Sequence, residues 1–146
     1  MTISRGQMNR QLYMGGGIMG AVPRENFFLG KAVKAVTKPF KKADLTTTDN
    51  TTLYTVPTAT TTVIKSILVS DDSGSGTTID VTLVDASSNI FSLFKSKSIS
   101  ANTTVELLTQ PLVMEASEIL KVQVGYAGRI HVIASILEIE PREVTT

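Results

Sequence analysis

The sequence predicts an all-β fold: an antiparallel β-sandwich or jelly-roll-like body behind an extended N-terminal arm that contains a short amphipathic helix. Three observations lead to this prediction. Apolar and polar residues alternate with a period of two from Thr51 onward, as they do in strands that cover a core with one face. The runs are rich in Thr, Val and Ile, whose branched side chains suit a pleated surface. Clusters of turn residues separate the runs at short intervals.

The alternation places nine short strands in the body. They are expected at residues 51–56, 62–70, 77–85, 89–95, 97–100, 103–109, 112–114, 118–124 and 129–139. Polar or glycine-containing loops separate several of them, such as the segment Asp71–Gly76. An α/β fold is not expected, because the helical periods that crossover connections require are missing.

The last expected strand is apolar on both faces. Ile133, Leu137 and Ile139 alternate with a second apolar set, which is Ile130, Val132 and Ile136. A strand with two apolar faces is either central in its fold or part of a subunit interface. We therefore name Ile133, Leu137 and Ile139 as a possible oligomer interface, with a central core strand as the equal alternative. The charges from Glu138 to Glu143 are expected to end the body in solvent.

Charge divides the chain into two parts. Residues 1–43 contain eight Lys or Arg and one Glu, a net charge of +7, whereas residues 44–146 contain six Lys or Arg and twelve Asp or Glu, a net charge of −6. Such a split is typical of a tail that engages a partner and a compact body. The expected organisation is a basic anchoring arm at 1–43, a linker at 44–50, a β-sandwich at 51–140 and a C-terminal tail at 141–146.

The second half of the arm has a helical period. Apolar residues recur at positions i, i+4, i+7 and i+11, and lysines recur on a second face, which predicts a basic amphipathic helix at about 27–38 that Pro39 ends. The lysines expected to steer the arm electrostatically are Lys31, Lys34, Lys38, Lys41 and Lys42. The helix could dock on an acidic protein groove, lie on a membrane, touch nucleic-acid phosphates or pack on its own body, and we rank these in the order protein, membrane, nucleic acid.

The first half of the arm is rich in glycine and carries regular apolar residues. This composition indicates an extended peptide that orders on a partner surface, where large side chains fill pockets and glycines let the backbone lie close. The residues expected to dock on the partner are Leu12, Tyr13, Ile18, Met19, Phe27, Phe28, Leu29, Val33, Val36 and Phe40.

No convincing catalytic or metal site can be assembled from the sequence. There is no cysteine, and His131 is the only histidine, so a transition-metal site or a Ser-His-Asp triad is hard to build. The segment Gly15–Gly17 lacks the Lys-Ser/Thr of a phosphate-binding loop. The acidic segment Asp71–Ser73 matches no calcium-loop spacing. We expect no enzyme activity and no cofactor.

Three segments resemble known phage proteins. MNRQLYMGGGIMGAVPRENFFLGKAVKAV (8–36) is similar to the N-terminal segments of small virion proteins of marine tailed bacteriophages. LYTVPTATTTVIKSILVSD (53–71) and TVELLTQPLVMEASEILKVQV (104–124) resemble the threonine-rich β-domains of the same group. The resemblance implies a virion location and a structural role, most plainly a capsid decoration or cement protein, with coat or tail subunits as partners and a homo-oligomeric state, a trimer by analogy.

Other functions stay open at this point. A tail or fibre-attachment component would use the same arm with a different dock. A surface glycan-binding module would need exposed aromatic residues at loop tips, for which Tyr126 alone qualifies. A membrane-active arm that assists genome delivery is the remaining alternative, and no specific nucleic-acid partner is expected.

Overall fold

The computed structural model describes residues 33–141, with side chains from Lys41 onward. These residues form strands β1 to β9, and no helix among them is long and apolar enough to cross a membrane. One sheet, called sheet A, contains β1 (Val33–Leu45), β9 (Ile130–Pro141), β3 (Thr61–Asp71), β6 (Thr104–Glu106) and β7 (Leu112–Met114). The other, sheet B, contains β2 (Thr51–Thr55), β8 (Ile119–Val124), β4 (Thr77–Val84) and β5 (Ile90–Ile99).

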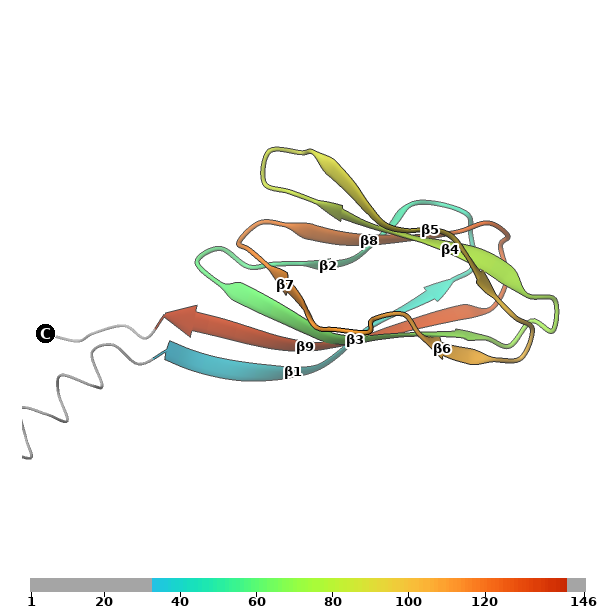
Figure 1. The fold of residues 1–146 in the computed structure, drawn as a ribbon, viewed down its shortest axis with the longest axis horizontal. Coiled ribbons are helices and arrows are strands. Elements are labelled where there is room, and N and C mark those ends of the chain that lie inside the picture. Colours follow the sequence, from blue (N-terminus) through green and yellow to red (C-terminus); the bar gives the residue numbers. More distant parts are fainter. Residues whose placement is uncertain (1–32, 142–146) are drawn as a thin grey trace, which may run out of the picture. The chain divides into compact units, whose positions relative to one another are not determined.

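The pairing of the strands is nested, as in a jelly roll. β4 and β5 form a hairpin in sheet B, β3 pairs with β6 in sheet A, β2 pairs with β8 in sheet B, and β1 pairs with β9 in sheet A. Each pair encloses the previous one in the sequence and lies in the opposite sheet, which is the winding of an eight-stranded jelly roll; β7 is an additional short strand on β3. The predicted all-β, jelly-roll-like fold class is therefore confirmed (Figure 1).

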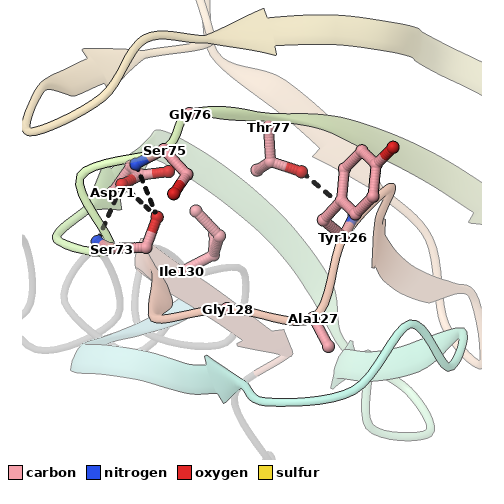
Figure 2. Close-up of a pocket in the computed structure, with 9 residues that line it drawn as sticks. All are labelled: Asp71, Ser73, Ser75, Gly76, Thr77, Tyr126, Ala127, Gly128 and Ile130. Atoms are coloured by element: carbon pink, nitrogen blue, oxygen red, sulfur yellow. Dashed lines mark hydrogen bonds between the residues drawn. The ribbon is translucent and has the colours of Figure 1, made fainter.

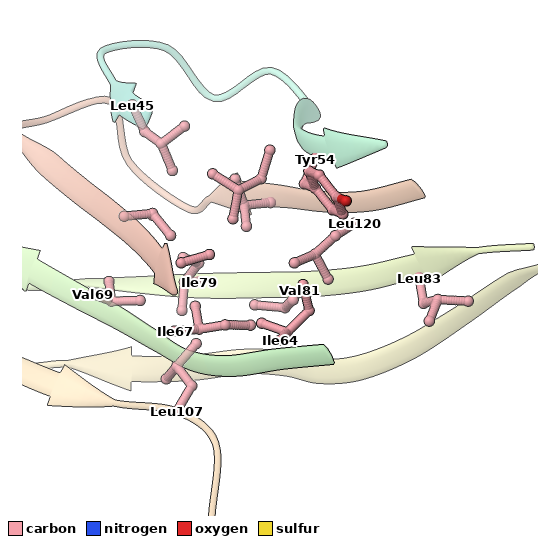
Figure 3. Close-up of a cluster of buried hydrophobic side chains, with 14 of the residues drawn as sticks. Leu45, Tyr54, Ile64, Ile67, Val69, Ile79, Val81, Leu83, Leu107 and Leu120 are labelled. Carbon is pink, nitrogen blue, oxygen red and sulfur yellow. The ribbon is translucent and has the colours of Figure 1, made fainter. Parts of the chain in front are cut away.

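The core lies between the two sheets and follows from the period-two alternation. In β9 every second residue from Ile130 to Glu138 is buried, and in β4 Ile79, Val81 and Leu83 are buried. Figure 3 shows part of this cluster, in which Ile64 and Ile67 of β3 lie near side chains of sheet B. Successive residues of a strand point to opposite faces, so a period-two apolar pattern places one complete set of side chains in this layer.

The structure corrects the predicted helix and the predicted start of the body. Residues 33–38 belong to β1, whereas the helix was expected at 27–38; residues 27–32 lie outside the described range. β1 continues to Leu45, which is buried in the core, so residues 33–45 belong to the sheet and not to an arm and linker. The physical reason is that β9 supplies hydrogen-bond partners to the backbone of β1, and an edge strand tolerates Pro39, which would break a helix interior.

A carboxylate stabilises a bulge in each sheet. In β3 the register shifts near Ser66, where Glu106 accepts hydrogen bonds from the Ser66 hydroxyl and from the Ile67 N–H at 2.8 Å. In β5 the register shifts near Ser96, where Asp80 accepts the Ser96 N–H at 2.6 Å. The bulge explains why the sequence suggested two strands at 89–95 and 97–100, where the structure has one.

Candidate functional site

His131 and its neighbours do not form a catalytic arrangement. The His131 side chain lies on the outward face of β9 and points away from the core. Its Nε2 is 3.4 Å from the Asp72 carboxylate, and its Nδ1 is 3.8 Å from the Asp44 carboxylate. The side chain is 41% exposed, and both neighbours are carboxylates. Within residues 33–141, no group of three or more His, Asp or Glu side chains is placed to hold a metal ion. The outward faces of the two sheets are therefore the candidate sites for binding a partner.

The outward face of sheet A carries two groups of apolar residues, with the pair Ser66–Ser135 between them. Leu68 of β3 lies opposite Ile133 of β9, and Val63 lies opposite both Leu137 of β9 and Val113 of β7. Directly opposed residues share a face, and these alternate with the buried residues of the same strands, so they point away from the core. Together with Ile139 they are called the apolar face of sheet A, which comprises Val63, Leu68, Val113, Ile133, Leu137 and Ile139.

The structure thus brings together Ile133, Leu137 and Ile139, which the sequence suggested as an interface. All three are half-buried, while Leu68 is 37% and Val113 57% exposed. Val63, Leu68 and Val113 also belong to this face and were not predicted from the sequence. Their signal was present, because β3 and β7 carry apolar residues at consecutive positions, as β9 does.

The outward face of sheet B is mostly polar. Asp80 lies opposite Gln123, and Thr82 lies opposite Lys121. Asp80 also pairs with Lys95 at 2.5 Å, and the Gln123 side chain donates to the Thr48 carbonyl at 2.8 Å. The hydrogen bond from Lys95 and the Ser96 N–H lower the pKa of Asp80, although burial opposes them. Polar residues that bind one another and water need no protein cover on this face.

Sheet B has an apolar end at the β4–β5 hairpin. Ile90 is 70% exposed and Phe91 52% exposed at the start of β5, which is an edge strand. An apolar edge strand is a template for pairing with another chain, and charged residues further along such a strand limit that pairing. In β5, the charged residues further along the strand are Lys95 and Lys97.

Several residues predicted for partner docking or for electrostatic steering lie in β1 or outside the described range. Val33, Val36, Phe40, Lys34 and Lys38 are within β1. Lys41 and Lys42 follow them in the same strand and are exposed, with the Lys41 ammonium 5.9 Å from the centre of the Tyr54 ring. Leu12, Tyr13, Ile18, Met19, Phe27, Phe28, Leu29 and Lys31 lie outside the described residues.

A buried polar cluster lies on the core side of sheet A. The Tyr54 hydroxyl donates to Glu138 at 2.8 Å and lies 2.9 Å from the Thr62 hydroxyl, which therefore acts as the donor to Tyr54. Glu138 is 3% exposed, so the expectation that Glu138 would lie in solvent is wrong. Alternation decides this, because Glu138 falls in register with the buried residues of β9. Burial raises the pKa of Tyr54 to about 12; the bond from Thr62 acts against this and Glu138 adds to it.

Comparison with known proteins finds similarity of fold only. No protein-family model matches the sequence, and no curated protein is detectably similar to it. The structure is similar to the protein of infectious bursal virus derived T=1 particles, with 14% identity, a TM-score of 0.44 and 75% of this chain aligned to 31% of that one. A pentameric capsid protein from metagenomic phage sequences has 18% identity, a TM-score of 0.38 and coverage of 75% and 66%.

A carbohydrate-binding protein is similar to the same extent. The C-terminal family 22 carbohydrate-binding module of Clostridium thermocellum Xyn10B has 14% identity, a TM-score of 0.37 and coverage of 78% and 84%. The chain spans less than a third of the length of the bursal virus protein. TM-scores below 0.5 at these identities carry no argument about function, which has to be derived from this chain's own surfaces.

Proposed function

We propose that this protein is a non-enzymatic structural component of a bacteriophage virion, and specifically a capsid decoration or cement protein. The observation that carries the proposal is the apolar face of sheet A, which a jelly-roll body with a well-packed core does not need for its own stability. The resemblance of residues 8–36 to phage virion proteins supports the same function. Jelly rolls occur in capsid and in lectin domains, so the fold alone does not select between them.

The proposed mechanism is stabilisation by mass action. A protein that bridges neighbouring coat subunits binds the assembled shell and not the free subunits, and so shifts the equilibrium toward assembly. Residues before β1 would bind the shell through Leu12, Tyr13, Ile18, Met19, Phe27, Phe28 and Leu29, with Lys31 and the lysines of β1 steering the approach. A second attachment point adds avidity to the contacts of the body.

We further propose that the apolar face of sheet A is the contact between copies of this chain. Ile133 and Leu137 lie near its centre, because their partners Leu68 and Val63 extend it into β3. Apolar side chains at the centre of an interface contribute most of its binding energy. A homo-oligomer, a trimer in analogous decoration proteins, would present several N-terminal segments to the shell at once.

Copy number separates a capsid protein from a tail protein. We expect quantitative mass spectrometry of purified particles to find this protein at a number of copies comparable to that of the coat subunit. A dozen copies or fewer would place it in the tail and contradict the decoration function.

Truncation tests the docking role, and the structure determines where to cut. Removing residues 1–32 leaves β1 intact, whereas removing residues 1–45 deletes an edge strand and the buried Leu45. We expect the shorter truncation to keep its β-sheet circular dichroism and to join particles at least about tenfold less than the full chain, the loss that corresponds to 1.4 kcal/mol. Normal incorporation of the shorter truncation would contradict docking through the N-terminal residues.

A further inference from the structure

A pocket at one end of the sandwich is built from two loops and contains a buried acid. The loop between β3 and β4 and the loop between β8 and β9 enclose a cavity of about 310 Å³. Its walls are Asp71, Ser73, Ser75, Gly76, Thr77, Tyr126, Ala127, Gly128 and Ile130 (Figure 2). This volume is at the small end of ligand sites and suits a single ring-sized group.

Asp71 has one carboxylate oxygen engaged and one without a partner. Oδ1 accepts the Ser73 N–H at 2.8 Å and the Ser73 hydroxyl at 2.9 Å, which shapes the loop. Oδ2 is buried, and no group among the described residues bonds to it, although Asp71 is only 2% exposed. A buried acceptor without a donor is unfavourable by an amount comparable to a lost hydrogen bond, and more for a charged group. Oδ2 is thus an acceptor at the pocket wall that lacks a donor, and a small shift of the surrounding loop side chains would let a donor in the pocket reach it.

The rest of the wall offers hydroxyl groups and an exposed ring. Thr77 accepts the Tyr126 N–H at 3.1 Å and so holds the β8–β9 loop beside the β3–β4 loop. The Tyr126 side chain is 76% exposed. Figure 2 shows Asp71 and Tyr126 on opposite sides of the pocket, with Thr77 and Ile130 between them. An exposed aromatic residue is costly to leave in water and offers a flat face to a ligand.

The pocket continues into a second hollow on the other side of Tyr126. Ser75, Gly76, Thr77 and Tyr126 line both, and the second is completed by Thr78, Ser98, Ile99, Ser100 and Ala101. Glycine suits position 76 in the shared wall, because a side chain there would be strained by the φ of +70° and its Cβ would lie 3.0 Å from the Ile99 carbonyl. A ligand longer than one ring could therefore extend past Tyr126 along hydroxyl groups.

We propose that this pocket binds a neutral saccharide, with a sugar ring against Tyr126 and a sugar hydroxyl donating to Oδ2 of Asp71. The hydroxyl groups of Ser75 and Thr77 can donate to a sugar, and that of Ser73, whose proton goes to Asp71, can still accept, as the alternating hydroxyls of a sugar require. The apolar C–H face of a pyranose fits the electron-rich face of tyrosine. An anionic ligand would be repelled by Asp71, and a metal ion would have only this one carboxylate in the lining.

The test measures saccharide binding to the full chain. A panel of methyl hexopyranosides and their neutral trisaccharides is titrated, with amide shifts by NMR and affinities by calorimetry. We expect at least one member to bind with a Kd below about 10 mM and to shift the amides of Tyr126 and Gly128. Tyr126→Ala should weaken binding about tenfold and Asp71→Asn about 10- to 100-fold, because the amide group presents a donor or a weaker acceptor to the sugar.

Matched controls keep the test decisive. Phe91→Ala removes another exposed aromatic residue, distant from the pocket in sheet B, and should leave the affinity within about twofold of the unchanged protein. If Asp71→Asn fails to fold, Gly128→Val replaces it, because a Cβ there meets Ser73 at an ordinary 3.7 Å and the added methyl groups narrow the cavity.

Three results would overturn the inference. One is that no sugar in the panel binds. Another is binding that Tyr126→Ala and Gly128→Val leave unchanged, which would place the sugar elsewhere. The third is that calcium chloride, and no saccharide, raises the melting temperature in a manner that Asp71→Asn abolishes, which would make the pocket a cation site.

Discussion

The outward faces of the two sheets differ in chemistry although both are made by the same alternation. On sheet A, the pairs Val63–Leu137 and Leu68–Ile133 place apolar side chains on β3 and β9, on either side of the pair Ser66–Ser135. On sheet B the corresponding positions hold Asp80, Thr82 and other polar residues. Both sheets place equivalent apolar sets in the shared core, so folding does not require the difference. We propose that sheet A is the side that protein covers, whereas the polar residues of sheet B suit contact with water.

The largest expected effect comes from placing a charge on the apolar face of sheet A. Leu137→Lys should weaken self-association by about 30- to 1000-fold, because an interface centre that buries an unpaired charge loses about 2–4 kcal/mol. Sedimentation velocity over a concentration series measures this. Thr82→Lys, at a half-buried outward position in the middle of β4, is the matched control and should leave association unchanged. Equal effects of the two substitutions would remove the proposed distinction between the faces.

The buried polar cluster under sheet A gives the next largest effect. Tyr54→Phe removes the hydrogen bond to Glu138 and should lower the free energy of unfolding by about 1–2 kcal/mol at pH 7. Urea unfolding followed by circular dichroism measures it. Thr55→Val, an exposed neighbour in β2, serves as control and should change stability little.

The same cluster predicts a dependence on alkaline pH. The pKa of Tyr54 is raised from 10.0 to about 12 in the folded protein, so the folded state holds the phenolic proton more tightly than the unfolded state. The corresponding stabilisation is complete below pH 10 and is lost as the pH rises toward 12. Unfolding of Tyr54→Phe should lack this loss, so the two proteins should converge in stability between pH 10 and 12. If the difference in stability between the two proteins stays constant from pH 10 to 12, the raised pKa of Tyr54 in the folded protein is contradicted.

The two bulge carboxylates allow a smaller test of the two sheets. Burial opposes ionisation of Glu106, but hydrogen bonds from Ser66 and from the N–H groups of Ile67 and Leu108 outweigh it and lower the pKa of Glu106. Glu106→Gln should lower the free energy of unfolding by about 1 kcal/mol near pH 7. The effect is small because Glu106 is exposed and solvent screens its charge. The pKa of Glu106 is lower in the folded than in the unfolded protein. Its contribution to stability is therefore present at a pH above its unfolded pKa and disappears as the pH falls below about 4. Acid unfolding of the variant and the unchanged protein measures it.

The smallest expected effect is on sheet B. Asp80→Asn removes the ion pair with Lys95, whose side chain is 76% exposed, and should lower stability by about 0.5 kcal/mol. High salt should abolish most of that difference, since exposed pairs are screened. If Asp80→Asn lowers the free energy of unfolding as much as Glu106→Gln does in the same urea assay, Asp80 stabilises the bulge in β5 more than an exposed ion pair should.

Local pattern predicted most of the body. β2, β3, β4, β7, β8 and β9 begin and end within two residues of the expected positions, because period-two alternation and turn chemistry act over a few neighbouring residues. β1 was mistaken for a helix because the spacing of Leu29, Val33, Val36 and Phe40 fits a helical stripe. The residues that override this spacing are in β9, about a hundred positions later in the chain.

The candidate sites were predicted less completely than the fold. Ile133, Leu137 and Ile139 were recognisable because one strand carried apolar residues on both faces. Val63, Leu68 and Val113 join them only through pairing between strands that are distant in sequence. Tyr126 was recognisable as an exposed aromatic residue at a loop tip, whereas the unpartnered oxygen of Asp71 was not, since it depends on which neighbours a folded loop provides.

The order of residues alone indicates most strands after Thr51, the apolar face that most of them turn to the core, and the concentration of positive charge near the N-terminus. These properties depend on the order of neighbouring residues and on composition. Only the tertiary structure decided that β1 is a strand, that Glu138 is buried with Tyr54, and that Asp71 and Tyr126 line one pocket. The reason is physical: hydrogen-bond partners, burial and cavities come from segments that meet only when the nested pairs of the jelly roll have closed.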